Sequence, residues 1–297
     1  METEISRGNL NLPVRKYSLD SFIEEYLQYS RTNKTPGAVK IDMQAIRSLK
    51  RIIDPKITSD ISPATLEKWK SVRANEVSPV AVNIELRQIK AMGRKGIQWG
   101  YMDIKQIEGV NQLKVPKKAP RFMSKEEISK LQTATPVRWW DMFSFFMLTG
   151  LRIGEFVHLK WDWVDFHKKT LTVKADSDWT PKDYESREIP LHPKLMGILE
   201  RLRKNKQGEY IFWNGANSAT LAARIGQKFS KYCKKAGIDH YRIHDLRHTF
   251  ASHMILNGAD LMVVRDLLGH SSVKRTEIYA HLYPSRHHEA VAQLALV

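Results

Sequence analysis

The chain has 297 residues, of which 42% are hydrophobic and 27% charged, so it is long enough for two folded domains and too apolar for wholesale disorder. Its single cysteine, Cys233, excludes an intrachain disulfide and a multi-cysteine zinc site, and no run reaches the roughly 20 apolar residues of a membrane span. The net charge is +16, and residues 1–120 and 121–297 each carry eight more basic than acidic side chains.

This even distribution of positive charge favours a polyanion that touches both halves of the chain, and double-stranded DNA is the obvious candidate. On charge alone, a protein that is basic without such a partner is the alternative. The first residues show neither an apolar signal core nor a basic leader. We therefore expect a cytoplasmic protein that has no membrane association.

Residues 18–110 are predicted to form a small all-α domain, preceded by a flexible lead-in over residues 1–17. Apolar residues recur at helical spacing after Ser18, and Ser62-Pro63 and Ser78-Pro79 each predict a capped helix with proline as its first residue. These helices have basic outer faces, formed by Arg47, Lys50, Arg51, Lys68, Lys70, Arg73, Arg87, Lys90, Arg94 and Lys95. For each of these residues alone, a solvated surface is the simpler interpretation.

Residues 111–121, with two prolines and four cations, predict an extended linker. Ser124 and Glu127 form a capping box that opens a second domain over residues 122–297. Between Trp161 and Leu191 the pattern favours three short antiparallel strands, with alternation over 170–173 and 187–191. Helical patterns follow over 194–203, 220–236, 244–257, 261–268 and 276–282. We expect a mainly α fold with a small antiparallel β-sheet, in which the second domain is α+β.

Five polar residues of the second domain lie at the ends of predicted elements: Arg152, His244, Arg247, His270 and Tyr279. Arginine and histidine side chains can stabilise the charge that develops on the oxygens of a phosphate during its transfer. A tyrosine hydroxyl can act as an oxygen nucleophile towards phosphorus. Taken singly, each residue also has an ordinary structural interpretation.

The segments Thr149-Gly-Leu-Arg152-Ile-Gly-Glu155, His244-x-x-Arg247 and Leu268-Gly-His270, followed by Tyr279, occur in an order and at separations that resemble the tyrosine recombinases. These are the phage-integrase and Xer-like site-specific DNA recombinases. The resemblance covers the whole second domain and implies that residues 122–297 are a catalytic domain. The first domain is similar to the core-binding (SAM-like) DNA-binding domain of the family only in its helices and basic faces.

The resemblance also implies a role for each residue of the phosphate-binding group. Arg152 and Arg247 would clamp the scissile phosphate of DNA. His244 would accept a proton and contact the phosphate, and His270 would donate a further hydrogen bond to it. Glu155 would orient this group of side chains from behind.

By the same resemblance, Tyr279 would attack phosphorus, leaving a 3′-phosphotyrosine and a free 5′-hydroxyl. The general acid of the family is a hairpin lysine about eight residues before a proline; counting back from Pro190 gives Lys182, with Lys174 as a competitor. The chemistry implied needs no metal, ATP or other cofactor. His287-His288 has no accompanying carboxylate or cysteine cluster that would suggest a metal site.

The partners implied are double-stranded DNA and three further copies of the chain, as a homotetramer on two DNA sites. The tail after Tyr279 has a short amphipathic pattern that fits docking either on a neighbouring protomer or on its own domain. His248, His253 and His281 are given an ordinary structural interpretation. Two alternative functions are a type IB topoisomerase-like activity and a DNA-binding or architectural protein that does not cut; the intact set of five polar residues argues against the second.

Overall fold

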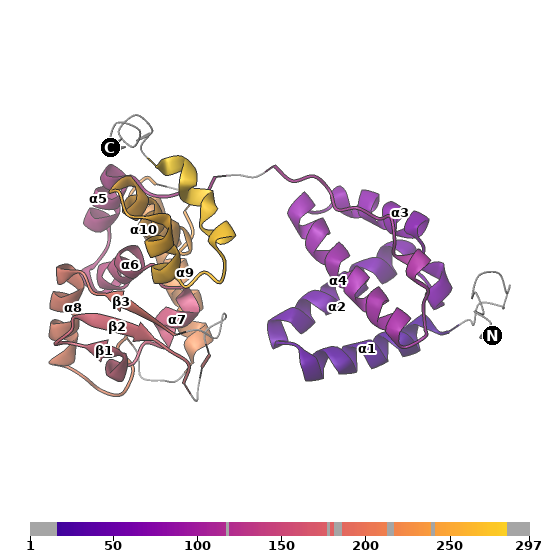
Figure 1. Ribbon diagram of the computed structural model, residues 1–297, viewed down its shortest axis with the longest axis horizontal. Coiled ribbons are helices and arrows are strands. Elements are labelled where there is room, and N and C mark those ends of the chain that lie inside the picture. Colours follow the sequence, from indigo (N-terminus) through magenta and orange to yellow (C-terminus); the bar gives the residue numbers. More distant parts are fainter. Residues whose placement is uncertain are drawn as a thin grey trace, which may run out of the picture. The chain divides into compact units, whose positions relative to one another are not determined.

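The computed structural model describes residues 17–116, 119–176, 179–180, 186–212, 217–238 and 241–283. The chain divides into two compact units, Met1–Lys117 and Lys118–Val297, each with its own apolar core (Figure 1). The fold is mainly α with a small antiparallel sheet, which confirms the predicted class. The positions outside the described residues include residues 1–16 of the predicted lead-in, Lys182, the His287-His288 pair and the C-terminal tail from residue 284 on.

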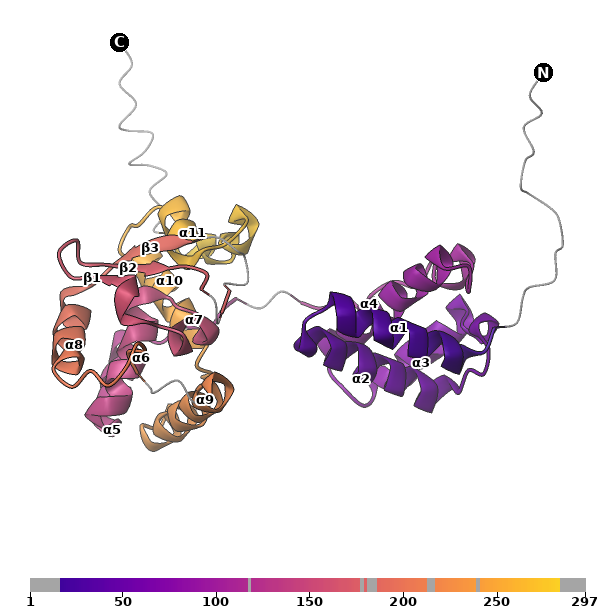
Figure 2. The same ribbon diagram turned by 90° about the horizontal axis from the view of Figure 1, so that it is seen from below.

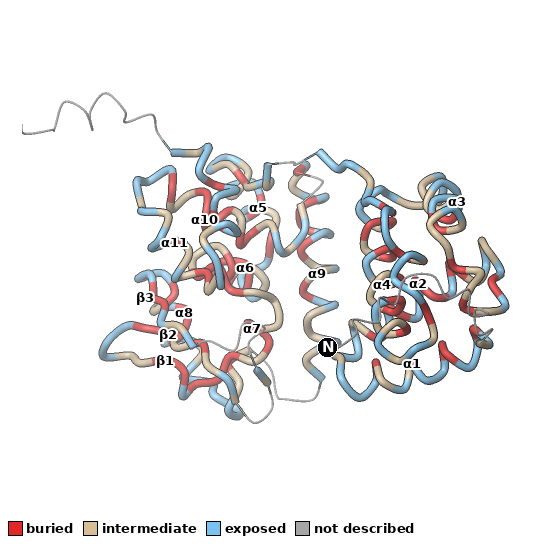
Figure 3. The backbone as a smooth tube through the Cα atoms, turned by 45° about the vertical axis from the view of Figure 1, so that its right-hand side comes forward, coloured by how far each residue is buried: buried red, intermediate tan, exposed pale blue. Residues whose placement is uncertain are grey.

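Two helices of the first unit begin at the caps that the sequence predicts, Ser62 and Ser78. Ser18, Ser62 and Ser78 each accept a backbone N–H at a helix start, and proline follows directly in the last two cases. Buried and exposed segments alternate along these helices, as expected when one face packs on a core (Figure 3). The described elements are α1 (Leu19–Asn33), α2 (Pro36–Ile53), η1 (Thr58–Asp60), α3 (Pro63–Ala74), α4 (Pro79–Gln98) and η2 (Ile104–Gln106).

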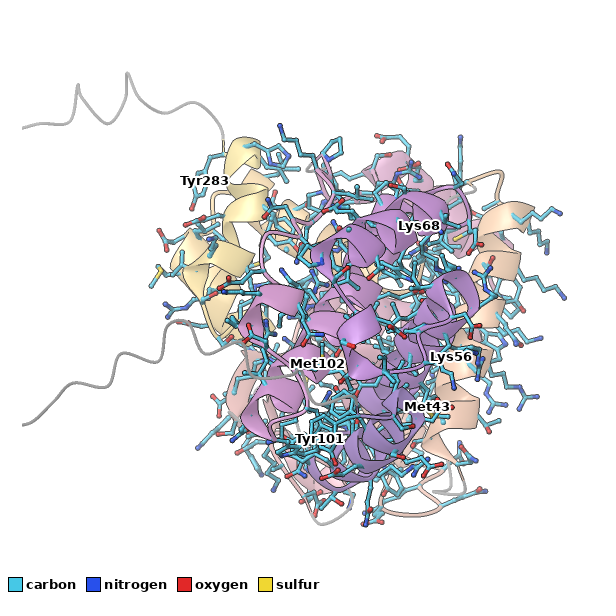
Figure 4. The ribbon with its side chains drawn as sticks, turned by 90° about the vertical axis from the view of Figure 1, so that its right-hand side faces the viewer. Met43, Lys56, Lys68, Tyr101, Met102 and Tyr283 are labelled. Atoms are coloured by element: carbon cyan, nitrogen blue, oxygen red, sulfur yellow. The ribbon has the colours of Figure 1, made fainter. Side chains whose placement is uncertain are left out.

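A buried polar cluster joins α2, α3 and α4. The carboxylate of Glu85, 1% exposed, accepts two bonds from the guanidinium of Arg73, at 2.7 and 2.9 Å. Ser48 and Gln44 donate to the same carboxylate, at 2.7 and 2.9 Å. The sequence placed Arg73 on the basic outer face, which is wrong: its side chain is 12% exposed because a buried carboxylate needs a cation. Lys68, by contrast, is exposed (Figure 4).

Acidification is expected to destabilise this cluster. Burial raises the pKa of Glu85, but the hydrogen bonds from Arg73, Ser48 and Gln44 lower it by more than burial raises it. The net pKa therefore lies below its ordinary value of 4.5. The folded state therefore binds this proton less readily than the unfolded state. The stabilising contribution is complete above pH 4.5 and is lost as the pH falls from there towards the lowered pKa.

We expect urea unfolding to report this loss when the full chain is compared at about pH 6 and about pH 3.5. Hydrogen exchange of peptides from α3 and α4, pulse-labelled at a common pH, would locate the effect. Glu85→Gln should lower the free energy of unfolding by about 2 kcal/mol at the higher pH and flatten the pH dependence of these peptides. An equal pH dependence in wild type and variant would contradict the assignment to Glu85.

The first residues of the predicted linker are held by the first unit. The side-chain amide of Asn83 in α4 donates to the carbonyl oxygen of Leu113 at 2.9 Å and accepts from its N–H at 2.8 Å. Lys70 donates to the carbonyl oxygen of Asn111 at 2.8 Å. Residues 114–116 and 119–124 have no regular secondary structure.

The second unit contains the predicted three-stranded antiparallel sheet, in the order β1 (Val164–Asp165), β2 (Thr170–Val173) and β3 (Arg187–Pro190). Its register pairs Val164 with Leu171, and Leu171 with Ile189, so these apolar side chains face the core. Helix α11 (Leu261–Leu268) lies next to β3 (Figure 2). The described elements are α5 (Lys125–Ala134), α6 (Val137–Thr149), α7 (Ile153–Val157), η3 (Trp161–Trp163), β1 (Val164–Asp165), β2 (Thr170–Val173), β3 (Arg187–Pro190), α8 (Pro193–Arg203), α9 (Ser218–Lys235), α10 (Asp245–Leu256), α11 (Leu261–Leu268), η4 (Val273–Arg275) and η5 (Glu277–Leu282).

Candidate active site

The ends of α6 and α11 provide the base on which the predicted site is built. Helix α6 is followed by its C-cap Gly150 and α11 by its C-cap Gly269, both in the left-handed conformation, with φ of 66° and 63°. A Cβ at Gly150 would also lie 2.5 Å from a ring carbon of Phe250, so glycine is required there on two grounds. These ends present backbone carbonyl groups that have no partner within their own helices, at the negative end of the helix dipole.

Arg247 is fixed by both helix ends at once. It lies in the first turn of α10, is 2% exposed, and donates to the carbonyl oxygen of Gly150 at 2.6 Å and to that of Leu268 at 2.7 Å. Burial lowers the pKa of this guanidinium to about 9, and the charge of Arg152 lowers it in the same direction. At neutral pH Arg247 is therefore a buried cation held by neutral acceptors.

Arg152 and Arg187 share the carboxylate of Glu155. Arg152 precedes α7; its backbone N–H and its guanidinium both donate to Glu155, at 2.8 and 3.0 Å, and it also donates to the carbonyl oxygen of Gly269 at 3.2 Å. Arg187 of β3 donates to the two carboxylate oxygens at 3.0 and 2.6 Å and to the carbonyl oxygen of Leu267 at 2.8 Å.

The charges of this group favour an anionic ligand. Three guanidinium groups surround one carboxylate. Glu155 is 1% exposed, accepts hydrogen bonds from Arg152 and Arg187, and interacts with the charge of Arg247 at longer range. Burial raises the pKa of Glu155, but the hydrogen bonds and the charge of Arg187 lower it by more than burial raises it, so the carboxylate stays ionised. The remaining positive charge suits a phosphate, which arginine recognises well.

Two histidines lie on one face of the start of α10. His244 is the residue before the helix and His248 follows one turn later, with their ring centroids 5.1 Å apart. Partial burial lowers the pKa of His244, as does the charge of Arg247. His270 follows α11, and its Nδ1 lies 2.9 Å from the hydroxyl oxygen of Thr276.

Tyr279 lies in η5, which packs on α10. Its side chain is 1% exposed, and its hydroxyl lies 2.6 Å from Nδ1 of His248. Burial raises the pKa of this phenol to about 12, against the opposing effect of the charge of Arg247. The structure thus brings Tyr279, the predicted nucleophile, close enough to Arg247, a predicted phosphate-binding residue, for the two to interact electrostatically.

Of the two lysines considered as the general acid, the structure describes only Lys174. Lys182 lies outside the described residues, so its placement stays a prediction. Its competitor Lys174 follows β2 and has its Nζ 3.2 Å from the carboxylate of Asp162, with 43% of its side chain exposed.

Sequence reasoning missed Arg187, His248 and Thr276. Arg187 is 32 residues from Glu155 in the chain, and only the folded structure brings the two side chains together. A signal for His248 was present, since it stands four residues after His244 and so shares its helix face. Thr276 was considered only as the first residue of the predicted helix over 276–282.

Arg187→Lys is expected to lower the free energy of unfolding by about 2 kcal/mol, because lysine cannot bond both carboxylate oxygens and a carbonyl group together. Urea unfolding measures this change. Arg51→Lys is the matched control: Arg51 is 53% exposed and pairs with Glu76, which is 32% exposed, so its change should stay within about 0.5 kcal/mol. Equal effects of the two substitutions would contradict the structural importance of Arg187.

Comparison with known proteins supports the resemblance to the tyrosine recombinases. Residues 119–286 match the model of the phage integrase family. The chain is 30% identical over 235 residues to tyrosine recombinase XerA of Pyrococcus furiosus, covering 76% of this chain and 78% of that protein. It is 27% identical over 293 residues to tyrosine recombinase XerC of Oceanobacillus iheyensis, covering 92% and 93%.

Solved structures share the fold. The lambda integrase dimer bound to a COC′ core site has a TM-score of 0.74 at 19% identity, covering 89% of this chain and 77% of that one. The Tn1549 transposon integrase in complex with transposon right end DNA has a TM-score of 0.75 at 18% identity, covering 94% and 100%.

The chain therefore belongs to the phage integrase family of tyrosine recombinases, the site-specific DNA recombinases that cleave and rejoin DNA strands. This membership does not favour the topoisomerase-like and non-cutting alternatives. Within the described residues, no helix is long and apolar enough to cross a membrane, and no group of three or more histidine, cysteine, aspartate or glutamate residues could hold a metal ion.

Proposed function

We propose that this chain recombines DNA through a covalent bond between Tyr279 and a 3′-phosphate, in a site where Arg152, Arg247 and His270 hold the scissile phosphate. The observation that carries the proposal is the anchoring of Arg247 between two helix ends beside Tyr279. Guanidinium groups fixed before the reaction need no reorganisation when charge grows on the phosphate oxygens. Glu155 orients Arg152 and keeps it in place.

In the cleavage step, the hydroxyl oxygen of Tyr279 forms a bond to phosphorus as the bond from phosphorus to the 5′ oxygen breaks. The leaving oxygen takes a proton from Lys182, which the family resemblance favours over Lys174. The phenolic proton passes to an imidazole, and the same resemblance assigns this role to His244. Rejoining is the reverse attack by a 5′-hydroxyl of another strand, so the phosphotyrosine conserves the bond energy without ATP or a metal.

The proposed partner is double-stranded DNA, contacted by residues 18–110 as the core-binding domain and by residues 122–297 as the catalytic domain, with 111–121 as linker. Positive charge on both parts supports this division. We further propose a homotetramer on two DNA sites, because lambda integrase, with the same fold, forms a tetramer bound to a Holliday junction. Integration, excision or resolution of DNA dimers in the cytoplasm are the reactions that this assembly would serve.

The test uses DNA that the full chain itself selects. Duplexes retained from a random-sequence library would be incubated with the chain, and DNA that becomes covalently attached would be sequenced to locate the cleavage point. Nicked forms of these duplexes should then trap a covalent complex, and mass spectrometry should find the DNA on Tyr279. No covalent complex from any selected duplex, or attachment at another residue, would overturn the proposal. Holliday junctions formed from two sites would show recombination beyond single-duplex cleavage.

A further inference from the structure

We propose that His248 is a catalytic residue, the acceptor of the proton that Tyr279 loses when it attacks phosphorus. This inference rests on the proposed function and makes it more specific. It moves the task of proton acceptance from His244, four residues earlier, to an imidazole that touches the nucleophile itself.

The geometry carries this assignment. Nδ1 of His248 lies 2.6 Å from the hydroxyl oxygen of Tyr279, and the two ring centroids are 5.8 Å apart. His248 is on α10, which also carries Arg247, so the proton acceptor and a phosphate-binding guanidinium belong to one rigid helix. The hydrogen bonds within the described residues include none between His244 and Tyr279.

The protonation states agree with this direction of transfer. Burial lowers the pKa of the His248 imidazole to about 4, and the charges of His244 and Arg247 act in the same sense. Tyr279 has its pKa raised to about 12. Near neutral pH the imidazole is therefore uncharged and the phenol keeps its proton, so the hydroxyl donates to Nδ1 and the imidazole proton is on Nε2.

The lowered pKa of His248 and the raised pKa of Tyr279 both oppose proton transfer before the attack on phosphorus. A free phenolate does not form in advance; the phenol becomes more acidic as its oxygen shares electrons with phosphorus, and the proton passes to Nδ1 in that same step. The bond to the 5′ oxygen breaks, and that oxygen takes its proton from the general acid. On rejoining, the imidazolium of His248 returns its proton to the phenolic oxygen as tyrosine leaves.

His244 retains a separate task. It lies at the start of α10, within the electrostatic influence of both Arg152 and Arg247. A side chain in that position is placed to contact the phosphate oxygens that these arginines hold. The two histidines are thus distinguished by what they touch, and a substitution can separate them.

Two substitutions separate proton acceptance from hydrogen bonding. The amide oxygen of asparagine can replace Nδ1 as an acceptor of the Tyr279 hydroxyl but cannot take its proton, whereas phenylalanine does neither. We expect His248→Asn and His248→Phe both to slow single-turnover formation of the covalent complex by about 10²–10⁴-fold. The substrate is the nicked duplex on which wild type forms that complex.

A second measurement links the defect to the nucleophile. Replacing Tyr279 by 3,5-difluorotyrosine gives a more acidic phenol, which needs less help from a base. It should recover on the order of tenfold of the rate lost in His248→Asn. It should not recover the rate of the matched control His244→Asn, whose contribution is to the phosphate. DNA binding and urea unfolding of each variant would show that it is folded.

The outcomes are distinct from those that test the proposed function. If wild type forms no covalent complex, the proposed function fails. If wild type forms the complex and His248→Asn reacts within about threefold of it, His248 acts only through its hydrogen bond and the inference is wrong. Recovery by difluorotyrosine in His244→Asn alone would return proton acceptance to His244 and equally overturn the inference.

Discussion

Tyr279→Phe is expected to abolish the covalent protein–DNA complex, with a loss of about 10⁴-fold or more in cleavage rate. The substitution removes the oxygen that would attack phosphorus and leaves the ring, which is 1% exposed and part of a core between α10, α11 and η5. The fold should therefore persist. The lost bond to His248 is expected to cost about 1–2 kcal/mol in the free energy of unfolding, because a buried acceptor loses its donor.

Denaturing gel analysis of the trapped complex measures the effect, together with a binding assay on the same DNA. Tyr283→Phe is the matched control, four residues further along the chain. Tyr283 is 37% exposed, and its hydroxyl donates to the carbonyl oxygen of Ala259 at 2.8 Å (Figure 4). Its variant should form the complex within about threefold of the wild-type rate. A covalent band that survives in Tyr279→Phe would show that another residue is the nucleophile.

Arg247→Lys should lower the cleavage rate by about 10²–10³-fold although the charge is conserved. A planar guanidinium reaches the carbonyl oxygens of Gly150 and Leu268 together while facing a phosphate, and a single ammonium group cannot do the same. One of these helix ends would lose its donor, so the free energy of unfolding should also fall, by about 1–3 kcal/mol.

Single-turnover cleavage and urea unfolding test these two effects of Arg247→Lys separately. Arg242→Lys, an exposed position five residues earlier, is the control and should change neither quantity appreciably. A variant at Arg247 that cleaves like wild type would show that charge alone is needed at this position. The role of the two carbonyl groups in orienting the cation would then be wrong.

The helix starts were predictable because their signals are local. A serine followed by proline at the first helical position identifies α3 and α4, and Ser124 with Glu127 identifies α5 through two reciprocal bonds. The short strand β2 was predicted with its observed bounds because its alternation is likewise contained in four residues.

Contacts between segments that are distant in the chain could not be predicted from the sequence. Arg187 reaches Glu155 across 32 residues, and Arg73 turns inward because Glu85 is buried on the next helix. Both required knowledge of which faces pack together. The segment around Tyr279 was predicted as a helix but forms the 3-10 helix η5, of only six residues. His248 was the one omission that helical spacing could have prevented.

The acceptors that hold Arg152, Arg187 and Arg247 are in part oxygens of the polypeptide backbone at the ends of α6 and α11. A substitution at one of these acceptor positions changes the side chain and leaves the carbonyl group in place, provided that the backbone conformation is kept. Laboratory evolution towards a new DNA target could therefore vary many surrounding positions without dismantling the clamp. Gly150 and Gly269 are the exceptions, because both have left-handed backbone angles and a Cβ would lie 2.5 Å from the ring of Phe250 at Gly150 and 3.0 Å from the side chain of Arg187 at Gly269. Randomised libraries should leave these two glycines unchanged.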